Sequence, residues 1–243
     1  MSQNGPPKVQ AAHAAAGLVE SGMLVGLGSG TTATEMVRAL GRRVREYHLH
    51  IQSVATSNST AELARAEGIT VRELDDVDEL DICLDGADEV DPSFRLIKGR
   101  GGALLREKIV AAAARVHVTM ITPEKRVDRL GKSMPIPVEV STVGLRHTER
   151  RLRALGAQTS VRMTSDGSLF RTDGGNAIVD CRFTDIDDVA ALDSRLQNVV
   201  GVFDTGIFLG LCDVLLVGYP GRAERIDKSS AIPSSDSPSL SGA

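Results

Sequence analysis

LDGADEVDPSFRLIKGRGGALLREKIV, residues Leu84–Val110, joins a buried strand to a helix through an acidic segment and a glycine turn. The apolar run Leu80–Leu84 predicts the strand, and Ala103–Arg115 predicts the helix. Val116–Ile121 then predicts a second strand. A strand, a crossover helix and a second strand form the unit from which parallel sheets are built.

The residues before this unit continue the same alternation. Strands are predicted at Met23–Gly26, Ile51–Ala55 and Ile69–Val71. The predicted helices are Lys8–Glu20, Thr31–Leu40 stopped by Gly41, and one that begins at the capping box Ser59-Thr60-Ala61-Glu62 and ends at Gly68. The pattern favours an α/β fold with a mostly parallel sheet and helices on both faces.

After Pro135 and Pro137 the pattern changes. Strand, helix, two strands, helix and strand are predicted in turn, at 138 onward, 145–155, 157–163, 176–182, 186–197 and 199–203. This order is that of a ferredoxin-like α+β unit, and Val214–Gly218 predicts a returning strand of the first sheet. We therefore expect residues 1–130 and 206–228 to form one domain and 131–205 an inserted one. The Ser/Pro-rich residues 229–243 are expected to be disordered.

Composition excludes several classes of protein. The net charge of −4, the 3% of aromatic residues and the absence of Trp argue against nucleic-acid binding. Three dispersed cysteines, Cys83, Cys181 and Cys212, favour buried thiols in a reducing compartment. No signal peptide or apolar run of about 18 residues is visible, so we expect a cytoplasmic protein without membrane contact. The five histidines form no ligand cluster, and no metal is expected.

A second glycine segment, Gly26-Leu27-Gly28-Ser29-Gly30-Thr31-Thr32-Ala33, joins a predicted strand to a helix. Backbone N–H groups at a helix N-terminus favour an anion, so a phosphate or sugar phosphate is one reading. Gly28–Ala33 also fits the dinucleotide fingerprint GxGxxA, but no acid ends the next strand to hold a ribose. A tight turn without a ligand is the third reading. Thr56-Ser57-Asn58 follows the next strand. These residues can either contact a ligand or cap the following helix.

The acidic segment offers acid–base groups. Asp85 and Asp88 follow the buried strand, Lys98 opens the glycine turn, and Glu107 lies early in the next helix. Such residues can merely be turn formers or a solvated helix face. Together, however, they provide the base, the cation and the anion donors that an aldose–ketose isomerase needs to form an enediolate.

Over about residues 8–220 the chain resembles the ribose-5-phosphate isomerases of the A type. Five segments carry the resemblance, in this order along the chain: GLGSGTTA, TSNST, LDGADEVD, IKGRGGALLREKIV and LGKSMPIPVEV. The resemblance implies a Rossmann-like large domain with a ferredoxin-like small domain, in a homodimer or homotetramer. It also implies interconversion of D-ribose 5-phosphate and D-ribulose 5-phosphate in the pentose phosphate pathway, without metal or cofactor.

Carried over by position, the resemblance implies roles for individual residues. Glu107 would shuttle a proton between C1 and C2, Asp85 would assist ring opening and proton transfer at oxygen, and Lys98 would support the oxyanion. Asp88 would orient sugar hydroxyls. Further substrate-binding positions would be Ser29, Gly30, Thr31, Thr32, Gly86, Ala87, Gly99, Arg100, Gly101, Lys125 and Lys8.

One position departs from the family, whose turn commonly reads KGGGGA. Arg100 replaces a glycine there, and a positive φ would cost it roughly 1 kcal/mol or more. Two other functions have related folds. A sugar-phosphate sensor of a transcription regulator would usually carry a helix-turn-helix, for which we expect the roughly 25 residues before the first glycine loop to be too short. An acyl-CoA transferase would need a larger site than the short loops provide.

Overall fold

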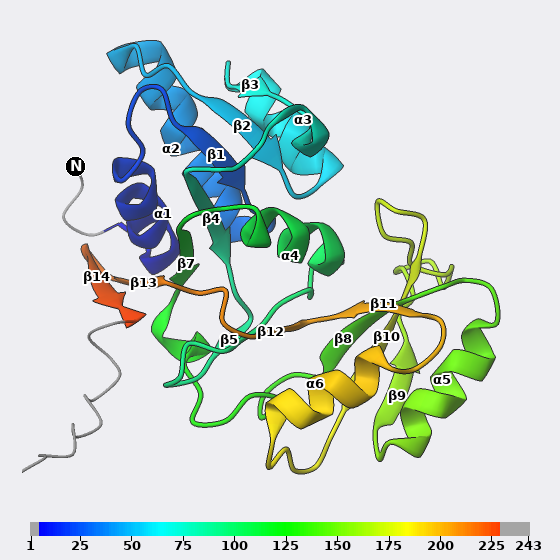
Figure 1. Ribbon diagram of the computed structural model, residues 1–243. Helices are drawn as coiled ribbons and strands as arrows, with labels where there is room; N and C mark the ends of the chain where they lie inside the picture. Colours follow the sequence, from blue (N-terminus) through cyan, green and yellow to red (C-terminus); the bar gives the residue numbers. More distant parts are fainter. Residues whose placement is uncertain (1–4, 229–243) are drawn as a thin grey trace, which may run out of the picture.

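The computed structural model describes residues 5–228, which form three sheets and their covering helices (Figure 1). The helices are α1 (Pro7–Gly17), α2 (Thr31–Tyr47), α3 (Asn58–Ala66), α4 (Leu104–Ala112), α5 (Leu145–Ala154) and α6 (Val189–Gln197), with short 3₁₀ turns at Leu74–Asp76 and Pro123–Lys125. The strands are β1 (Leu24–Leu27), β2 (Gln52–Ala55), β3 (Thr70–Val71), β4 (Ile82–Gly86), β5 (Glu89–Val90), β6 (Leu96–Ile97), β7 (His117–Ile121), β8 (Ile136–Val140), β9 (Gln158–Val161), β10 (Ala177–Arg182), β11 (Val202–Thr205), β12 (Ile207–Phe208), β13 (Val214–Tyr219) and β14 (Arg222–Asp227).

The largest sheet has the strand order β14-β13-β7-β4-β1-β2-β3. All its neighbouring strands are parallel except the β13–β14 pair. From β1 the chain first builds outward through β2 and β3, and then returns to the other side of β1 with β4. The order therefore reverses between β1 and β4, and ligands of open α/β sheets bind beyond the carboxyl ends of the strands at such a point.

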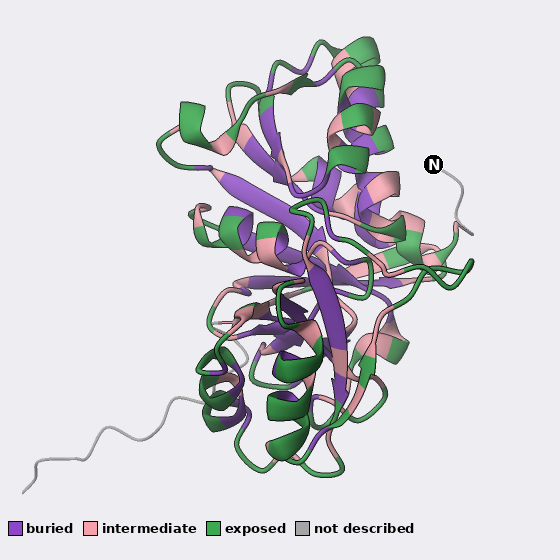
Figure 2. Cartoon of the chain, turned by 90° about the vertical axis from the view of Figure 1, so that its right-hand side faces the viewer, coloured by how far each residue is buried: buried purple, intermediate pink, exposed green. Residues whose placement is uncertain are grey.

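Helices cover both faces of this sheet, as the strand–helix alternation predicted. Apolar side chains of α1 and α2, among them Ala11, Met36 and Leu40, form the core on one face. Val110 and Ala111 of α4 pack on the other face against Cys83 of β4. Figure 2 shows buried strands in the middle of the molecule and helices with exposed outer sides. The resulting doubly wound arrangement confirms the Rossmann-like prediction.

The second sheet has the order β11-β8-β10-β9, and each pair in it is antiparallel. With α5 after β8 and α6 after β10, the chain order is β-α-β-β-α-β, so the ferredoxin-like prediction is also confirmed. Leu152 of α5 and Leu196 of α6 pack against Val138 of β8 in one core. In Figure 1 this unit lies beside α4, and α4 contacts β8 and β11 as well as β4.

A third sheet, β12-β6-β5, was not predicted because its strands have two residues each. It nevertheless sets the positions of functional residues. The Asp88 N–H donates to the Ile97 carbonyl (2.8 Å), and the Lys98 N–H donates to the Gly206 carbonyl (2.9 Å). These bonds fix the acidic segment and the start of the glycine turn side by side. The antiparallel edge strand β14 was also missed.

Two predictions about helix ends were wrong. α2 does not stop at Gly41 but continues to Tyr47, and it ends where His48 adopts a left-handed φ of 52°. Position 41 needs a glycine for close packing and not for a helix end, because a Cβ there would lie 2.5 Å from the Glu67 Cβ. The capping box at Ser59 does not form either. Ser57 caps α3 instead, with its Oγ accepting a hydrogen bond from the Thr60 N–H (3.1 Å).

The boundaries of other predicted elements shift by a few residues; α1, for instance, ends at Gly17 rather than Glu20. The three cysteines are buried and unpaired, as predicted. Within residues 5–228, no helix has the length and apolarity needed to cross a membrane. The predicted disorder of 229–243 falls outside the described residues.

Candidate active site

The carboxyl ends of β1 and β4 bring the first glycine loop against Asp85. Asp85 is fully buried, and its Oδ1 accepts hydrogen bonds from the N–H groups of Ser29 (3.1 Å) and Gly86 (2.7 Å). The contact requires a glycine at position 28, because a Cβ there would lie 2.0 Å from Asp85 Oδ1. The loop sequence is thus partly explained by a carboxylate that comes 57 residues later in the chain.

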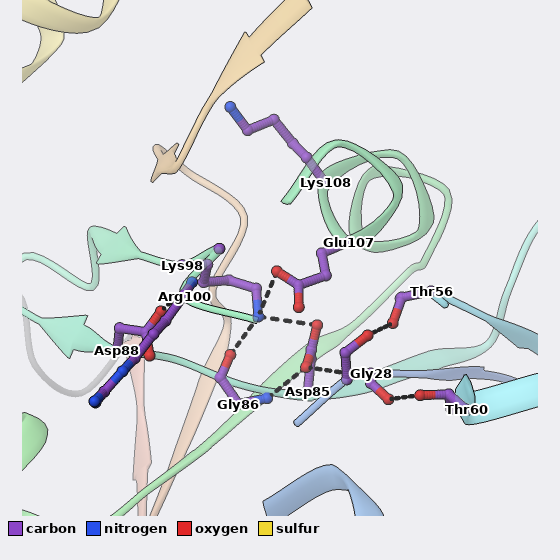
Figure 3. Close-up of polar contacts among 12 residues, drawn as sticks. Gly28, Thr56, Thr60, Asp85, Gly86, Asp88, Lys98, Arg100, Glu107 and Lys108 are labelled. Atoms are coloured by element: carbon purple, nitrogen blue, oxygen red, sulfur yellow. Dashed lines mark hydrogen bonds and ion pairs between the residues drawn. The ribbon is translucent and has the colours of Figure 1, made fainter. Parts of the chain in front are cut away.

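Lys98 links two carboxylates in the interior. Its Nζ lies 2.9 Å from Asp85 Oδ2 and 3.4 Å from Glu107 Oε2, and it also donates to the Gly86 carbonyl (Figure 3). Asp85, Lys98 and Glu107 are exposed by 0%, 2% and 5% respectively. A buried ion cluster of this kind is expensive to assemble and is common where chemistry requires it. Sequence reasoning had selected all three residues.

The two charged neighbours of Glu107 are tied to other parts of the protein. Arg106 donates to Asn58 Oδ1 (2.9 Å), whereas Lys108 donates to Asp204 Oδ1 (2.5 Å) and the Thr205 carbonyl (2.9 Å). Successive residues of a helix point about 100° apart, so these anchors fix the rotation of α4. They thereby hold the Glu107 side chain toward Lys98, and the charged trio is not a simple solvated face.

The surroundings of Glu107 disfavour its ionised form. Burial raises the pKa of Glu107 to about 8, while the charge of Lys98 opposes this shift and that of Asp85 adds to it. Asp85 has two N–H donors besides Lys98, but Lys98 is the sole donor to Glu107 within residues 5–228. Because one ammonium cannot neutralise two carboxylates, a proton added to the cluster goes to Glu107.

Lys98 stays an ammonium in this cluster. Burial by itself lowers the pKa of Lys98, but the charges of Asp85 and Glu107 outweigh burial, and the net shift is upward. The cluster therefore contains one permanent cation beside one carboxylate that can gain and lose a proton near neutral pH. This is the pairing that a general base and an oxyanion-stabilising group require.

A cleft of about 430 Å³ adjoins the cluster. Most of the predicted substrate-binding residues line it, whereas Asp85 lies behind its wall. The predicted residues in the lining are Lys8, Ser29, Gly30, Thr31, Thr32, Gly86, Ala87, Asp88, Lys98, Gly99, Arg100, Gly101, Glu107 and Lys125. The chain segments that carry them are separated by many residues, and the fold brings them to one place.

The N-terminus of α2 forms one wall of the cleft. Gly30 precedes the helix with a φ of 87°, and no side chain caps the first turn. Lys8 Nζ donates to Thr31 Oγ1 (3.1 Å), which places a cation beside the free N–H groups. Ser29 Oγ is held 2.6 Å from Thr56 Oγ1. Uncapped N–H groups and an adjacent ammonium make this wall suitable for a phosphate.

Asp88 and the glycine turn form a second wall. Asp88 Oδ2 accepts a hydrogen bond from the Arg100 N–H (3.0 Å), and its Oδ1 lies 3.9 Å from Lys125 Nζ. In the turn, Gly99 (99°) and Gly102 (87°) have positive φ angles, whereas the φ of Arg100 is not positive. The strain considered for Arg100 is therefore absent.

Sequence reasoning missed Met120, Ile121 and Thr122, which also line the cleft. Met120 and Ile121 end β7, the strand that pairs with β4 on the side away from β1, and Thr122 follows it. The rule that ligands meet strand carboxyl ends could have identified Thr122. Conversely, Thr56 and Ser57 do not line the cleft, because Thr56 supports Ser29 and Ser57 caps α3. Within residues 5–228, no group of three or more His, Cys, Asp or Glu side chains could hold a metal ion.

Comparison with known proteins agrees with this geometry. The sequence pattern of the family "Ribose 5-phosphate isomerase A (phosphoriboisomerase A)" matches residues 52–222. The ribose-5-phosphate isomerase A of Thermomicrobium roseum is 46% identical over 93% of this chain and 95% of its own length. That of Roseiflexus castenholzii is 48% identical over 87% of this chain and 91% of its own length.

Solved structures give the same result. The ribose 5-phosphate isomerase A of Methanocaldococcus jannaschii superposes with a TM-score of 0.86 at 37% identity, over 90% of this chain and 97% of that one. A D-ribose-5-phosphate isomerase in complex with phospho-erythronic acid superposes with a TM-score of 0.87 at 35% identity, over the same shares of the two chains. The chain belongs to the ribose 5-phosphate isomerase A family.

Proposed function

We propose that the protein interconverts D-ribose 5-phosphate and D-ribulose 5-phosphate through an enediolate, as a step of the non-oxidative pentose phosphate pathway. The observation that carries this proposal is the position of Glu107, which is buried, lines the cleft and lies 3.4 Å from the Lys98 ammonium. A base and a cation so close together suit proton transfer between adjacent carbons of one substrate.

The substrate phosphate would bind at the N-terminus of α2. Free N–H groups of the first turn, the hydroxyls of Thr31 and Thr32, and the Lys8 ammonium are the donors available there. With the phosphate at this wall, the other end of an open-chain pentose extends toward Lys98 and Glu107. Asp88 and the turn Gly99–Gly101 would then contact hydroxyls between the two ends, and Lys125 would add positive charge.

The reaction starts with the aldose carbonyl at C1. Glu107, as the carboxylate, removes the proton from C2, and the electron pair moves to the C1 carbonyl oxygen. Lys98 stabilises the charge on that oxygen, and this becomes easier because Glu107 has lost its own charge by accepting the proton. A proton then passes from O2 to O1, and Glu107 returns its proton to C1, which leaves the carbonyl at C2.

Asp85 contributes by holding Lys98 at 2.9 Å and the Ser29 N–H at 3.1 Å. Its two oxygens are occupied within the protein, so its proposed action on the substrate passes through Lys98. Assistance of ring opening by Asp85 stays a prediction. The phospho-erythronic acid bound by a relative of 35% identity supports the proposed chemistry, because its carboxylate has the planar, charged shape of an enediolate.

The test is to follow ketose formation from ribose 5-phosphate by the purified protein in the presence of EDTA, beside Glu107→Gln. We expect turnover by the unsubstituted protein and a loss of about 10³-fold or more in the variant, the scale of a missing general base. Binding of ribose 5-phosphate without turnover by the unsubstituted protein would instead identify a sugar-phosphate sensor. Undiminished turnover in Glu107→Gln would assign the base to another residue.

Further proposals concern organisation. We propose that residues 1–130 with 206–228 form the catalytic domain and 131–205 the small domain. We also propose a homodimer or homotetramer, which light scattering would measure, and a location in the cytoplasm, where the three thiols would stay reduced.

A further inference from the structure

The turn after Lys98 connects the ion cluster to the cleft wall. The Gly102 N–H donates to the Gly99 carbonyl (3.0 Å), so Arg100 and Gly101 are the central residues of a β-turn. A type II turn would require a positive φ at Gly101, and Gly101 does not have one. A glycine there can adopt either sign of φ, so the peptide between Arg100 and Gly101 could flip unless something holds it.

Arg162, which follows β9 in the small unit, contacts this peptide. Its Nη1 donates to the carbonyls of Gly99 (2.9 Å) and Arg100 (3.0 Å). Its Nε and Nη2 donate to the two oxygens of Asp180, at 2.9 Å and 2.5 Å. The guanidinium carbon also lies 5.8 Å from the centre of the Phe170 ring. The contacts with Asp180 and Phe170 therefore fix the Arg162 guanidinium, and with it the direction in which Nη1 points.

The direction of the two carbonyls determines where the turn's N–H groups point. No peptide bond in residues 5–228 is cis, so each N–H points opposite to the carbonyl of the same peptide. The Gly99 carbonyl faces Arg162, and the Arg100 N–H of that peptide reaches Asp88 Oδ2. By the same geometry, the Gly101 N–H points away from Arg162. Gly101 lines the cleft, and its N–H has no acceptor within residues 5–228.

We propose that Arg162 is a positioning residue of the isomerase: by holding the Gly99 and Arg100 carbonyls, it presents the Gly101 N–H to an oxygen of the bound sugar phosphate. The inference rests on the proposed function for the identity of the ligand. Without Arg162, the peptide can flip and turn the Arg100 carbonyl toward the cleft. An acceptor would then face an anionic, oxygen-rich substrate where a donor had been.

The expected signature is a change in KM rather than in kcat. Arg162→Met should raise KM for ribose 5-phosphate about tenfold or more, the effect of losing a hydrogen bond to a charged ligand, with kcat within about threefold. Arg162→Lys should fall between, because an ammonium can donate to the carbonyls but lacks the fork that binds Asp180. The matched control is Arg153→Met, which removes an arginine of the same unit that pairs with Glu149 at 2.8 Å, and it should leave KM unchanged.

A second measurement does not require turnover. In ¹⁵N-labelled protein titrated with ribose 5-phosphate, the Gly101 amide resonance should shift in the unsubstituted protein and shift much less in Arg162→Met, with Arg162→Lys between the two. These shifts would support Arg162 even if the unsubstituted protein bound the sugar phosphate without isomerising it, which would contradict only the proposed function. If Arg162→Met fails to fold, KM and the Gly101 shift measured with Arg162→Lys and Asp180→Asn test the proposal instead. Folded variants with unchanged KM and an unchanged Gly101 shift would overturn the proposal.

Discussion

At the scale of single residues, Glu107 and Asp85 show how environment separates two carboxylates. Both face one ammonium, but Asp85 also has the N–H groups of Ser29 and Gly86. Asp85 thus has a donor for each of its two oxygens, whereas burial raises the pKa of Glu107 to about 8. The difference makes Asp85 a structural partner of Lys98 and the first glycine loop, and it makes Glu107 the candidate for proton transfer.

The raised pKa predicts how activity depends on pH. Glu107 must be a carboxylate to accept the C2 proton, so kcat/KM should rise with pH through the pKa of Glu107 in the free enzyme. We expect an acidic limb with a midpoint well above the 4.5 of an ordinary glutamate, toward about 8. Initial rates between pH 5 and pH 9, in buffers of constant ionic strength, would measure it. A limb centred at or below 4.5 would contradict the raised pKa of Glu107.

Arg100 is a central residue of the second glycine turn, where the resemblance implies a glycine. Since its φ is not positive, glycine offers no relief of strain there, and the N–H that binds Asp88 is present in either residue. We predict that Arg100→Gly keeps kcat/KM within about tenfold, because the turn contacts survive and only extra flexibility is added. Steady-state kinetics and circular dichroism would check this. Complete inactivation with an intact fold would show that the Arg100 side chain itself takes part in the reaction.

At the scale of elements, α4 contacts both large sheets and carries Glu107. Val110 packs on the β4 side, Lys108 reaches Asp204 on β11, and Glu107 points between them into the cluster. The apolar periodicity of the helix was readable from the sequence, as was its entry from a glycine turn. Its partners were not, because Asp204 lies 96 residues further along the chain.

The errors in element boundaries have the same origin. Gly41 looked like a helix stop because local propensity was all that could be read, but Glu67 packs against it and the helix continues. The strands β5, β6 and β12 gave no periodic signal over two residues each. Their hydrogen bonds become visible only when the chain is folded, although they place Asp88 and Lys98 side by side.

At the scale of the whole molecule, the small unit contacts the second glycine turn and the start of α3. Arg162 binds the second glycine turn, and Asp173 Oδ2 accepts a hydrogen bond from the Asn58 N–H at the start of α3 (2.7 Å). The ion pair of Asp173 with Arg106 is longer, at 3.6 Å, and both side chains are partly exposed. The hydrogen bond to the helix N-terminus is therefore the stronger of the two contacts.

This docking predicts a stability effect. Asp173→Ala should lower the free energy of unfolding by about 1 kcal/mol, because α3 loses an acceptor at its N-terminus. The expected fall in Tm is about 2–4 °C for a chain of this size, measured by calorimetry. Asp187→Ala is the control, since Asp187 is exposed and has no partner within residues 5–228. Equal Tm values for the two variants would contradict a role of Asp173 in docking.

Much of the site could be read from the sequence, since Asp85, Asp88, Lys98 and Glu107 lie in one short segment and the fold keeps them together. The change from the strand–helix alternation of the large sheet to the β-α-β-β-α-β order of the small unit was readable as well. What could not be read are contacts between distant segments, such as that of Arg162 with residues 62 and 63 positions earlier. No local pattern marks a residue whose role depends on a partner so distant in the chain.

The central claim is that one carboxylate, Glu107, removes the proton from C2 of the sugar. Exchange of that proton with solvent tests it most directly, by ¹H NMR of ribose 5-phosphate in D₂O with the unsubstituted protein and with Glu107→Gln. We predict that the C2 proton is lost with the unsubstituted protein and retained with the variant, at a rate lower by about 10³-fold or more. Exchange by a folded Glu107→Gln variant at the unsubstituted rate would contradict the account.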